Sequence, residues 1–203
     1  MIKNDLKEKL YKIYEAKGIE KQIVNIFGVR KTGSSSLDNK YEDVLGFDIN
    51  GEIYIFEGTT KAGKPYTLNP LNINGCACVK EGFHKEVWQL GFHRPDTAFG
   101  HEAFVQTGNK ITVVRDKNKN GIIDPYEIEY VGFFGINLHG GGKAEIDDIN
   151  RDSAGCQVMR HRTELLNIVL PEIKKLDEIK KNPKFKFSYL LLNQTEFPEV
   201  FVF

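Results

Sequence analysis

The sequence predicts a mostly-β fold, a β-sandwich or partly closed barrel, with one helix near each end of the chain. Short β-rich runs separated by Gly, Pro, Asn and Asp occupy most of residues 23–138. Apolar residues recur at helical spacing near residues 4–17 and again at 165–176. A chain of 203 residues suffices for one sizeable domain. We therefore divide it into an N-terminal helix, residues 1–22, and a β-rich domain, residues 23–203.

The N-terminal segment reads as an amphipathic helix that ends before Gly18. Lys and Glu separate the residues of its apolar face, which are Leu6, Leu10, Ile13 and Tyr14. The pattern is compatible with packing on the domain and with binding a partner.

The middle of the chain predicts strands and loops in alternation. A strand covers residues 23–29, and residues 44–56 form a hairpin that turns at Asn50-Gly51. Residues 61–74 are rich in Gly, Pro and Asn and predict a loop. Further short strands are expected at 75–80, 86–92, 102–106, 110–115 and 127–138.

After residue 156 the apolar spacing becomes helical. The apolar stripe faces away from many Lys and Glu side chains and consists of Leu165, Leu166, Val169, Ile173 and Leu176. Pro171 is expected to interrupt or kink this helix. Alternating apolar residues at 185–191 then predict a closing strand.

The composition excludes several classes of function. Lys+Arg and Asp+Glu both number 28, so the net charge gives no general attraction to nucleic acid or to an anionic membrane. The first residues lack a signal-peptide core, and no run reaches the roughly 18 apolar residues of a membrane span. We expect a protein made in the cytoplasm, without a signal peptide and without a membrane span.

Cys156 stands in a run of small residues that suits a catalytic thiol. Ser153, Ala154 and Gly155 leave room for a substrate backbone, and Gly155 can adopt the turn that points the thiol outward. A thiol attacks well only as the thiolate, so it needs a nearby base. We expect the following helix to place its positive end near the sulfur, and backbone amides of the turn to form an oxyanion hole.

His139 is the best candidate for the base among five histidines. It ends a β-rich run and precedes Gly140 and two further glycines, a setting that suits an open site better than a packed core. By spacing alone, the pair of His139 and Cys156 is often structural. Zinc binding by these two residues and His161 is an alternative that lacks an evident fourth ligand.

These residues resemble the L,D-transpeptidase catalytic domain, whose pattern is HG followed by SHGC. The resemblance is closest to a phage and bacterial branch of that superfamily, and it is carried by Phe134-Gly135-Ile136-Asn137-Leu138-His139 and Ser153-Ala154-Gly155-Cys156-Gln157-Val158. Gly58-Thr59-Thr60 also fits, and the resemblance covers residues 23–192. It implies an L,D-transpeptidase-type β-sandwich over the β-rich domain, with a helix after the catalytic cysteine.

The resemblance implies chemistry on peptidoglycan stem peptides. Cys156 would form an acyl-enzyme, with His139 as the base, and the acyl group would pass to an amine or to water. Ala154 stands where the family usually has His, and Val158 where it usually has Arg. Arg151, Arg160 or Arg162 are candidates to replace that arginine.

Three functions remain open. The leading one is an L,D-peptidase of endolysin type or a transpeptidase, which acts at the cell wall after phage release or virion carriage. The second is a non-catalytic virion or wall-binding protein that retains the fold. The third is a cysteine protease that acts on proteins.

Residues 116–127 fit the twelve-residue calcium-loop pattern. Oxygen ligands would come from the side chains of Asp116, Asn118, Asn120, Asp124 and Glu127 and from the carbonyl of Ile122. The flanking residues are strand-like, so the loop would join two strands and would not form an EF-hand. We expect a structural Ca²⁺ at most, with no cofactor required for the chemistry; a polar hairpin without metal is the alternative.

Overall fold

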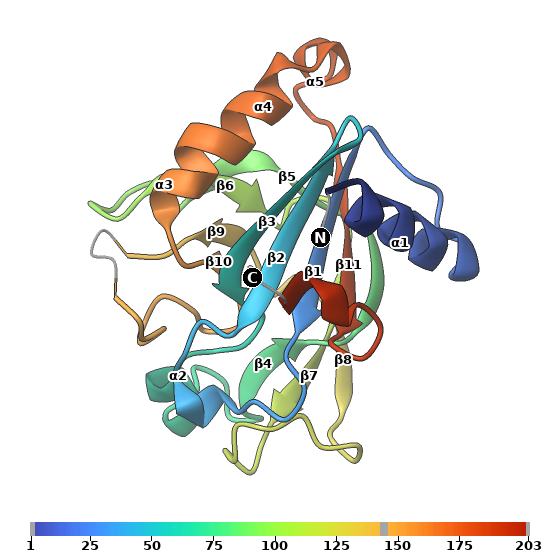
Figure 1. Ribbon diagram of the computed structural model, residues 1–203. Coiled ribbons are helices and arrows are strands. Elements are labelled where there is room, and N and C mark those ends of the chain that lie inside the picture. The colour runs from blue at the N-terminus through green and yellow to red at the C-terminus, as the bar shows by residue number, and fades with distance from the viewer. Residues whose placement is uncertain (1–2, 143–145, 202–203) are drawn as a thin grey trace.

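The computed structural model describes residues 3–142 and 146–201, and eight of its strands form a closed barrel (Figure 1). Neighbours pair antiparallel, except that β1 pairs with β11, and β9 with β10, in parallel. In their order around the barrel the strands are β1 (Val24–Arg30), β11 (Phe187–Asn193), β5 (Gly82–His93), β6 (His101–Val105), β9 (Leu138–Gly140), β10 (Gln157–Met159), β3 (Glu52–Thr59) and β2 (Asp43–Ile49). The mostly-β class is confirmed, and the barrel closes fully.

A second, antiparallel sheet lies beside the barrel and consists of β4 (Cys76–Val79), β7 (Ile111–Asp116) and β8 (Glu129–Gly132). The strand predicted at residues 127–138 is wrong, because its two ends belong to different sheets. Side chains replace the strand ladder between them: Gln106 Oε1 accepts the amides of Phe134 and Ile136 at 2.9 and 3.0 Å. Trp88 donates its indole N–H to the Ile136 carbonyl at 2.8 Å.

Large aromatic and aliphatic side chains fill the barrel. The fully buried ones include Trp88, Phe104, Phe187, Tyr189 and Leu138. The Tyr189 hydroxyl donates to Gln157 Oε1 at 2.7 Å, which satisfies the polar side chain of β10 inside this core.

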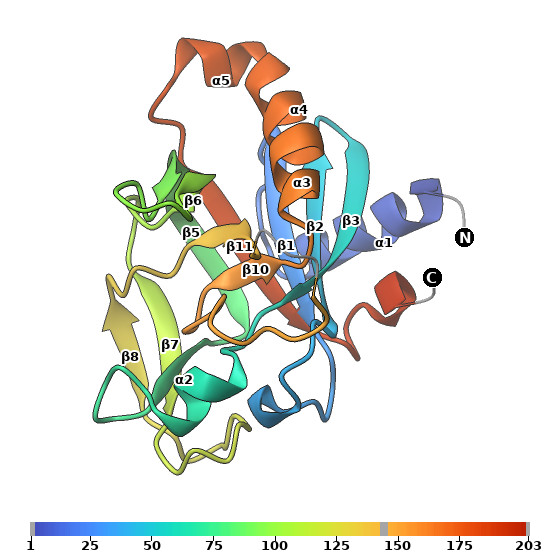
Figure 2. The same cartoon turned by 90° about the vertical axis from the view of Figure 1, so that its left-hand side faces the viewer.

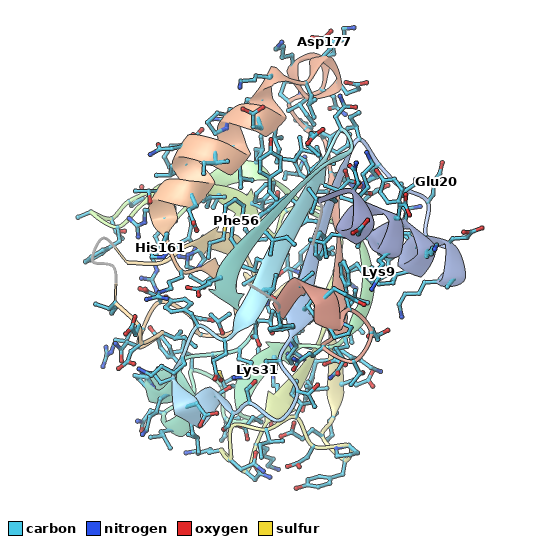
Figure 3. All side chains as sticks on the ribbon, viewed as in Figure 1. Lys9, Glu20, Lys31, Phe56, His161 and Asp177 are labelled. Atoms are coloured by element: carbon cyan, nitrogen blue, oxygen red, sulfur yellow. The ribbon has the colours of Figure 1, made fainter. Side chains whose placement is uncertain are left out.

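The N-terminal helix α1 (Lys3–Ala16) packs on the outer face of the barrel (Figure 1). Its buried residues Leu10 and Tyr14 join an apolar cluster with Phe27 of β1 and Phe197. Lys9, labelled in Figure 3, forms an ion pair with Glu199 of the C-terminal 3-10 helix η3 (Pro198–Phe201). Of the two roles open to this helix, the structure shows packing on the domain.

Two short helices lie outside the helical segments that the sequence predicts. The 3-10 helix η1 (Ser36–Asp38) is capped by the Ser35 side chain. Helix α2 (Lys64–Leu68) lies within the predicted loop 61–74, where Pro65 occupies its first turn, a position that tolerates the missing N–H.

The helical segment predicted after Cys156 forms in four pieces, α3 (Arg162–Glu164), the π-helix η2 (Leu165–Val169), α4 (Leu170–Lys175) and α5 (Asp177–Lys181). Pro171 does not end it, because the chain adopts a π turn directly before the proline, in which the Leu170 amide donates to the Leu165 carbonyl. Leu165, Val169 and Ile173 are buried against the barrel core. Within the described ranges, no helix is long and apolar enough to cross a membrane.

We predict that Leu10→Ala lowers the free energy of unfolding by about 2–4 kcal/mol, because it removes a fully buried side chain between α1 and the barrel. Urea denaturation of the whole chain measures the change. Lys12→Ala, on the exposed face of α1, is the control and should stay within about 0.5 kcal/mol of wild type. Equal stability of the two variants would show that α1 does not contribute to the folded core.

Candidate active site

The parallel pairing of β9 with β10 brings His139 and Cys156 together. Val158 pairs with His139 and Gln157 with Leu138, so Cys156 begins the segment that enters β10 (Figure 2). Leu138 and Gln157 point into the barrel, which leaves His139 and Cys156 on its outer face. With strands ~4.8 Å apart and a rise of ~3.3 Å per residue, their Cα atoms lie about 8 Å apart.

The turn before the sulfur depends on Gly155 and Ser153. Gly155 has φ +127°, and a Cβ there would lie 2.6 Å from the Ala77 carbonyl oxygen. The buried Ser153 hydroxyl donates to the Cys156 carbonyl at 2.8 Å and accepts the Gly155 amide at 3.1 Å. These residues shape the turn, and the Gly155 amide is already bonded, so it is not a free oxyanion donor.

The Cys156 sulfur is half-buried. It accepts the Asn137 amide at 3.5 Å and donates to the Gly135 carbonyl at 3.6 Å. Burial raises the pKa of this thiol, while the Asn137 hydrogen bond and the positive charge of Arg94 lower it to a smaller extent. At neutral pH the group is therefore a thiol.

The helix expected to activate the sulfur lies elsewhere. Strand β10 separates Cys156 from the first helical residue, Arg162. Arg162 lies against Gly140, where a Cβ would come within 2.6 Å of the Arg162 Cα. Since Gly140 pairs with Met159, the helix starts at the opposite end of β10 from the thiol. The expectation that its positive end flanks the sulfur is wrong, and Gly140 instead allows the helix to approach β9.

His139 is buried and neutral. It is 3 % exposed, and its Nδ1 lies 2.8 Å from the Gly140 carbonyl oxygen, which makes Nδ1 the protonated nitrogen. Nε2 is buried without a hydrogen-bond partner among the described residues. Burial, and then the neighbouring His93, hold the pKa of His139 well below its ordinary value. The imidazole is therefore neutral, with a free lone pair on Nε2.

The thiol and the imidazole are not hydrogen-bonded to each other in this state, since Nε2 has no partner and the sulfur contacts Asn137 and Gly135. Proton transfer requires the sulfur to rotate away from the Gly135 carbonyl. Such loose geometry is common before substrate is bound.

Two histidines that the sequence analysis did not assign to the site surround the base. The His93 ring stacks on His139, with centroids 3.8 Å apart and an interplanar angle of 10°. His101 packs edge-on against both, at 5.7 Å from each. Burial first, and then the charges of Arg94 and His101, lower the pKa of His93 to about 4. Neutral neighbours therefore surround the neutral base.

Hydrogen bonds hold this cluster in place. Asn137 Nδ2 lies 3.0 Å from His93 Nδ1, and the Gly140 amide donates to His101 Nε2 at 3.1 Å. Asn137 also binds the thiol through its amide and the Gln106 amide through its side-chain oxygen. One residue thus connects the nucleophile to the histidine cluster.

The acidic residues near Cys156 do not orient the base. Asp147 pairs with Arg160, and Asp148 with Lys40. Asp152 accepts hydrogen bonds from the Tyr41 hydroxyl and the Gly142 amide. The Gly140 carbonyl orients His139 instead, a contact that residue types alone could not reveal.

The loop at residues 116–127 joins β7 to β8, two strands, as predicted. The Asp116 carboxylate accepts the amides of Asn120 and Gly121 at 3.1 and 2.8 Å. Asn118 and Asn120 both donate their side-chain N–H to Asp124 Oδ2, at 2.9 and 3.0 Å. Those amides would have to turn to present their oxygens to a cation.

Glu127 supplies the one observation that favours a cation in this loop. Its Oε2 accepts the Asp124 amide at 3.2 Å, while its Oε1 is buried without a partner among the described residues. The Ile122 side chain is exposed, and its amide donates to Asn120. In the described part of the chain no group of three or more His, Cys, Asp or Glu is arranged to hold a metal. A bound Ca²⁺ would therefore depend on the amide and carbonyl oxygens as well.

No family model matches the chain, and no curated protein matches it.

We predict that the rate at which iodoacetamide alkylates Cys156 has no plateau near pH 6–7. The rate should still increase with pH above 9.0, the ordinary pKa of a thiol. The raised pKa of Cys156 and the lowered pKa of His139 favour the neutral pair over a thiolate–imidazolium pair. Peptide mass spectrometry resolves Cys156 from Cys76 and Cys78. A plateau at pH 6 that His139→Gln abolishes would contradict the neutral resting state.

Proposed function

We propose that this protein is a cysteine-dependent enzyme that acts on peptidoglycan stem peptides through an acyl-enzyme on Cys156. The observation that carries the proposal is the neutral His139, whose unpartnered Nε2 lies on the same outer face of β9 and β10 as the thiol. The resemblance of the two motifs to L,D-transpeptidases supports this substrate class and a fold of that type.

In the proposed reaction, His139 Nε2 takes the proton of Cys156 as the sulfur attacks the carbonyl before a D-amino acid. The tetrahedral intermediate then collapses, the C–N bond breaks, and His139 gives the proton to the leaving amine. Water or a second amine attacks the thioester in turn, with His139 again as the base. The lowered pKa of His139 suits it to accept the proton only when the bond to carbon forms.

Arg94 is our candidate for holding a carboxylate of the substrate. Its positive charge acts on Cys156 and on the three histidines of the cluster. Arg160 forms ion pairs with Glu57 and Asp147, and Arg162 donates to the Gly141 carbonyl. Arg94 is exposed beside the site and has φ +50°, a conformation that is unfavourable for a residue other than glycine.

The loop at residues 116–127 is proposed to bind a structural Ca²⁺, with the unpartnered Glu127 Oε1 among the ligands. When bound, the ion would brace the β7–β8 connection, while the reaction itself needs no cofactor. Peptidoglycan is the proposed partner, and release or carriage by a phage is the proposed route to the cell wall.

We predict that the wild-type protein releases or exchanges the terminal D-residue of purified stem tetrapeptides, and that intact-mass spectrometry detects the acyl group on Cys156. Cys156→Ala should abolish both signals, and His139→Gln should slow the reaction by about a hundredfold or more. His84→Gln is the matched control, because His84 is a buried histidine that packs on Tyr189 outside the site.

Faster cleavage of a peptide bond to an L-residue than of one to a D-residue would favour a protease. No product and no acyl-enzyme would favour a non-catalytic virion or wall protein.

We predict that Ca²⁺ at millimolar concentration raises the melting temperature by several degrees and that Glu127→Gln removes most of this shift. Differential scanning calorimetry with and without a chelator measures it. Glu129→Gln, which changes an exposed carboxylate of β8 paired with Lys80, should retain the shift. A melting temperature independent of Ca²⁺ would leave the loop as a metal-free hairpin.

A further inference from the structure

A cavity of about 190 Å³ lies at the end of the barrel that faces the second sheet. Its walls come from the segment after β1, the residues after β3, strand β4, and the loop at residues 121–123. Lys31, labelled in Figure 3, lies on its rim. Cys156 and His139 do not line this cavity, although its wall contacts the turn before Cys156, where Cys76 Sγ donates to the Ala154 carbonyl at 3.6 Å.

Arg30 brings a buried guanidinium to this cavity. The side chain is only 6 % exposed, and its Nε and Nη2 donate to Thr60 and to the Val79 carbonyl at 2.8–3.2 Å. Nη1 is buried without a hydrogen-bond partner among the described residues. Its nearest carboxylate oxygen, from the partly exposed Glu81, lies 3.6 Å away, beyond hydrogen-bond distance. One strong donor is therefore unsatisfied.

Lys61 brings a second buried cation. It is 3 % exposed, and its ammonium contacts the hydroxyl of Ser34, a neutral partner. Within residues 3–142 and 146–201 no carboxylate lies within ion-pair distance of it. A buried ammonium without a counter-charge is costly, because its desolvation is not offset.

The charged side chains that line the cavity differ in how they are paired. Three basic side chains, Arg30, Lys31 and Lys61, face two acidic ones, Glu81 and Asp116. Lys31 is paired with Glu42 at 2.7 Å, and Asp116 is occupied by backbone amides. Lys61 is therefore the basic side chain of the cavity that has no ion pair within the described residues, and it lies with Arg30 Nη1, which lacks a hydrogen bond, on the same cavity.

The remaining wall is neutral and contains both polar groups and the apolar residues Ala62, Ala77, Ile122 and Ile123. Cys76 and Cys78 line the cavity, and burial raises the pKa of both thiols, so they carry no charge at neutral pH. Hydroxyls of Thr32, Ser34 and Ser36 add further polar groups. Since a cavity of ~150 Å³ admits benzene, this one has room for a compact polar ligand.

We propose that this cavity binds a compact oxyanion, with one oxygen on Arg30 Nη1 and another on Lys61 Nζ. Such a ligand satisfies the unpartnered donor, supplies the missing counter-charge of Lys61, and meets the hydroxyls of the wall. The oxyanion is carried either by an inorganic ion such as phosphate or by a small carboxylate. The proposal stands whatever reaction Cys156 performs.

The thiols of the cavity allow a direct test. The protein carries Cys156→Ala, so that Cys76 and Cys78 are its remaining thiols. Two methanethiosulfonates of similar size are used, one bearing a sulfonate and one a quaternary ammonium. Each labelling rate, measured by intact-mass spectrometry, is divided by the rate of the same reagent with a free small thiol, because any thiolate reacts faster with the cationic reagent, and these normalised rates are compared. We expect the anionic reagent to label about tenfold faster or more. Equal rates, or faster labelling by the cation, would overturn the proposal.

Protection by anions tests binding without any change to the cavity. Labelling by neutral methyl methanethiosulfonate is measured with phosphate, with malonate, and with chloride at equal ionic strength. Slower labelling with phosphate identifies an inorganic oxyanion, and slower labelling with malonate alone identifies a carboxylate. If the labelling rate in phosphate and in malonate equals the rate in chloride, the proposal is overturned.

Lys61→Met should abolish the preference for the anionic reagent. Lys64→Met, which changes an exposed lysine three residues away, should retain it and serves as the control. Circular dichroism first establishes that each variant is folded. If Lys61→Met does not fold, the protection assay decides the outcome. Equal preference in the two folded variants would show that Lys61 does not bind the anion.

Discussion

The parallel pairing of β9 with β10 is the constraint on which the candidate active site depends. Two strands of three residues each place Cys156 beside Asn137 and His139 beside Val158, on the outer face of the barrel. Inside the barrel, Leu138 and Gln157 fix the register, because a slip of one residue would move the thiol and the imidazole into the core. The site is thus determined by packing on the opposite face of the same strands.

Burial decides the protonation states of the site more than specific charges do. Desolvation raises the pKa of Cys156 and lowers that of His139, so both are neutral at rest. The aromatic contact of His93 and the carbonyl of Gly140 hold the base in one tautomer without a carboxylate partner. In the proposed reaction such a pair would move its proton as the new bond forms, and a positive charge such as that of Arg94 would stabilise the developing anion.

Three of the polar atoms that the fold buries without a hydrogen bond belong to the proposed sites. His139 Nε2, Glu127 Oε1 and Arg30 Nη1 each lack a hydrogen bond among the described residues, and each faces a site with a different proposed ligand. Buried polar groups are generally satisfied, since an unpaired one costs about 1–3 kcal/mol. In our proposals, the proton of Cys156 would satisfy His139 Nε2, a cation would satisfy Glu127 Oε1, and an oxyanion would satisfy Arg30 Nη1.

Local patterns in the sequence were sufficient to predict the β class and the two helical segments. They also predicted the hairpin at Asn50-Gly51 and the loop between strands at residues 116–127. Each of these features depends on residues that are neighbours in the chain. The small residues before Cys156 and the motif at His139 also indicated the candidate pair. Tertiary structure alone brought in His93 and His101, which lie on β5 and β6, far from His139 in the chain. It also divided residues 127–138 between two sheets, because the distant side chains of Gln106 and Trp88 satisfy that backbone. Spacing along a chain carries information about periodicity and turns, whereas contacts between distant strands depend on how the barrel closes.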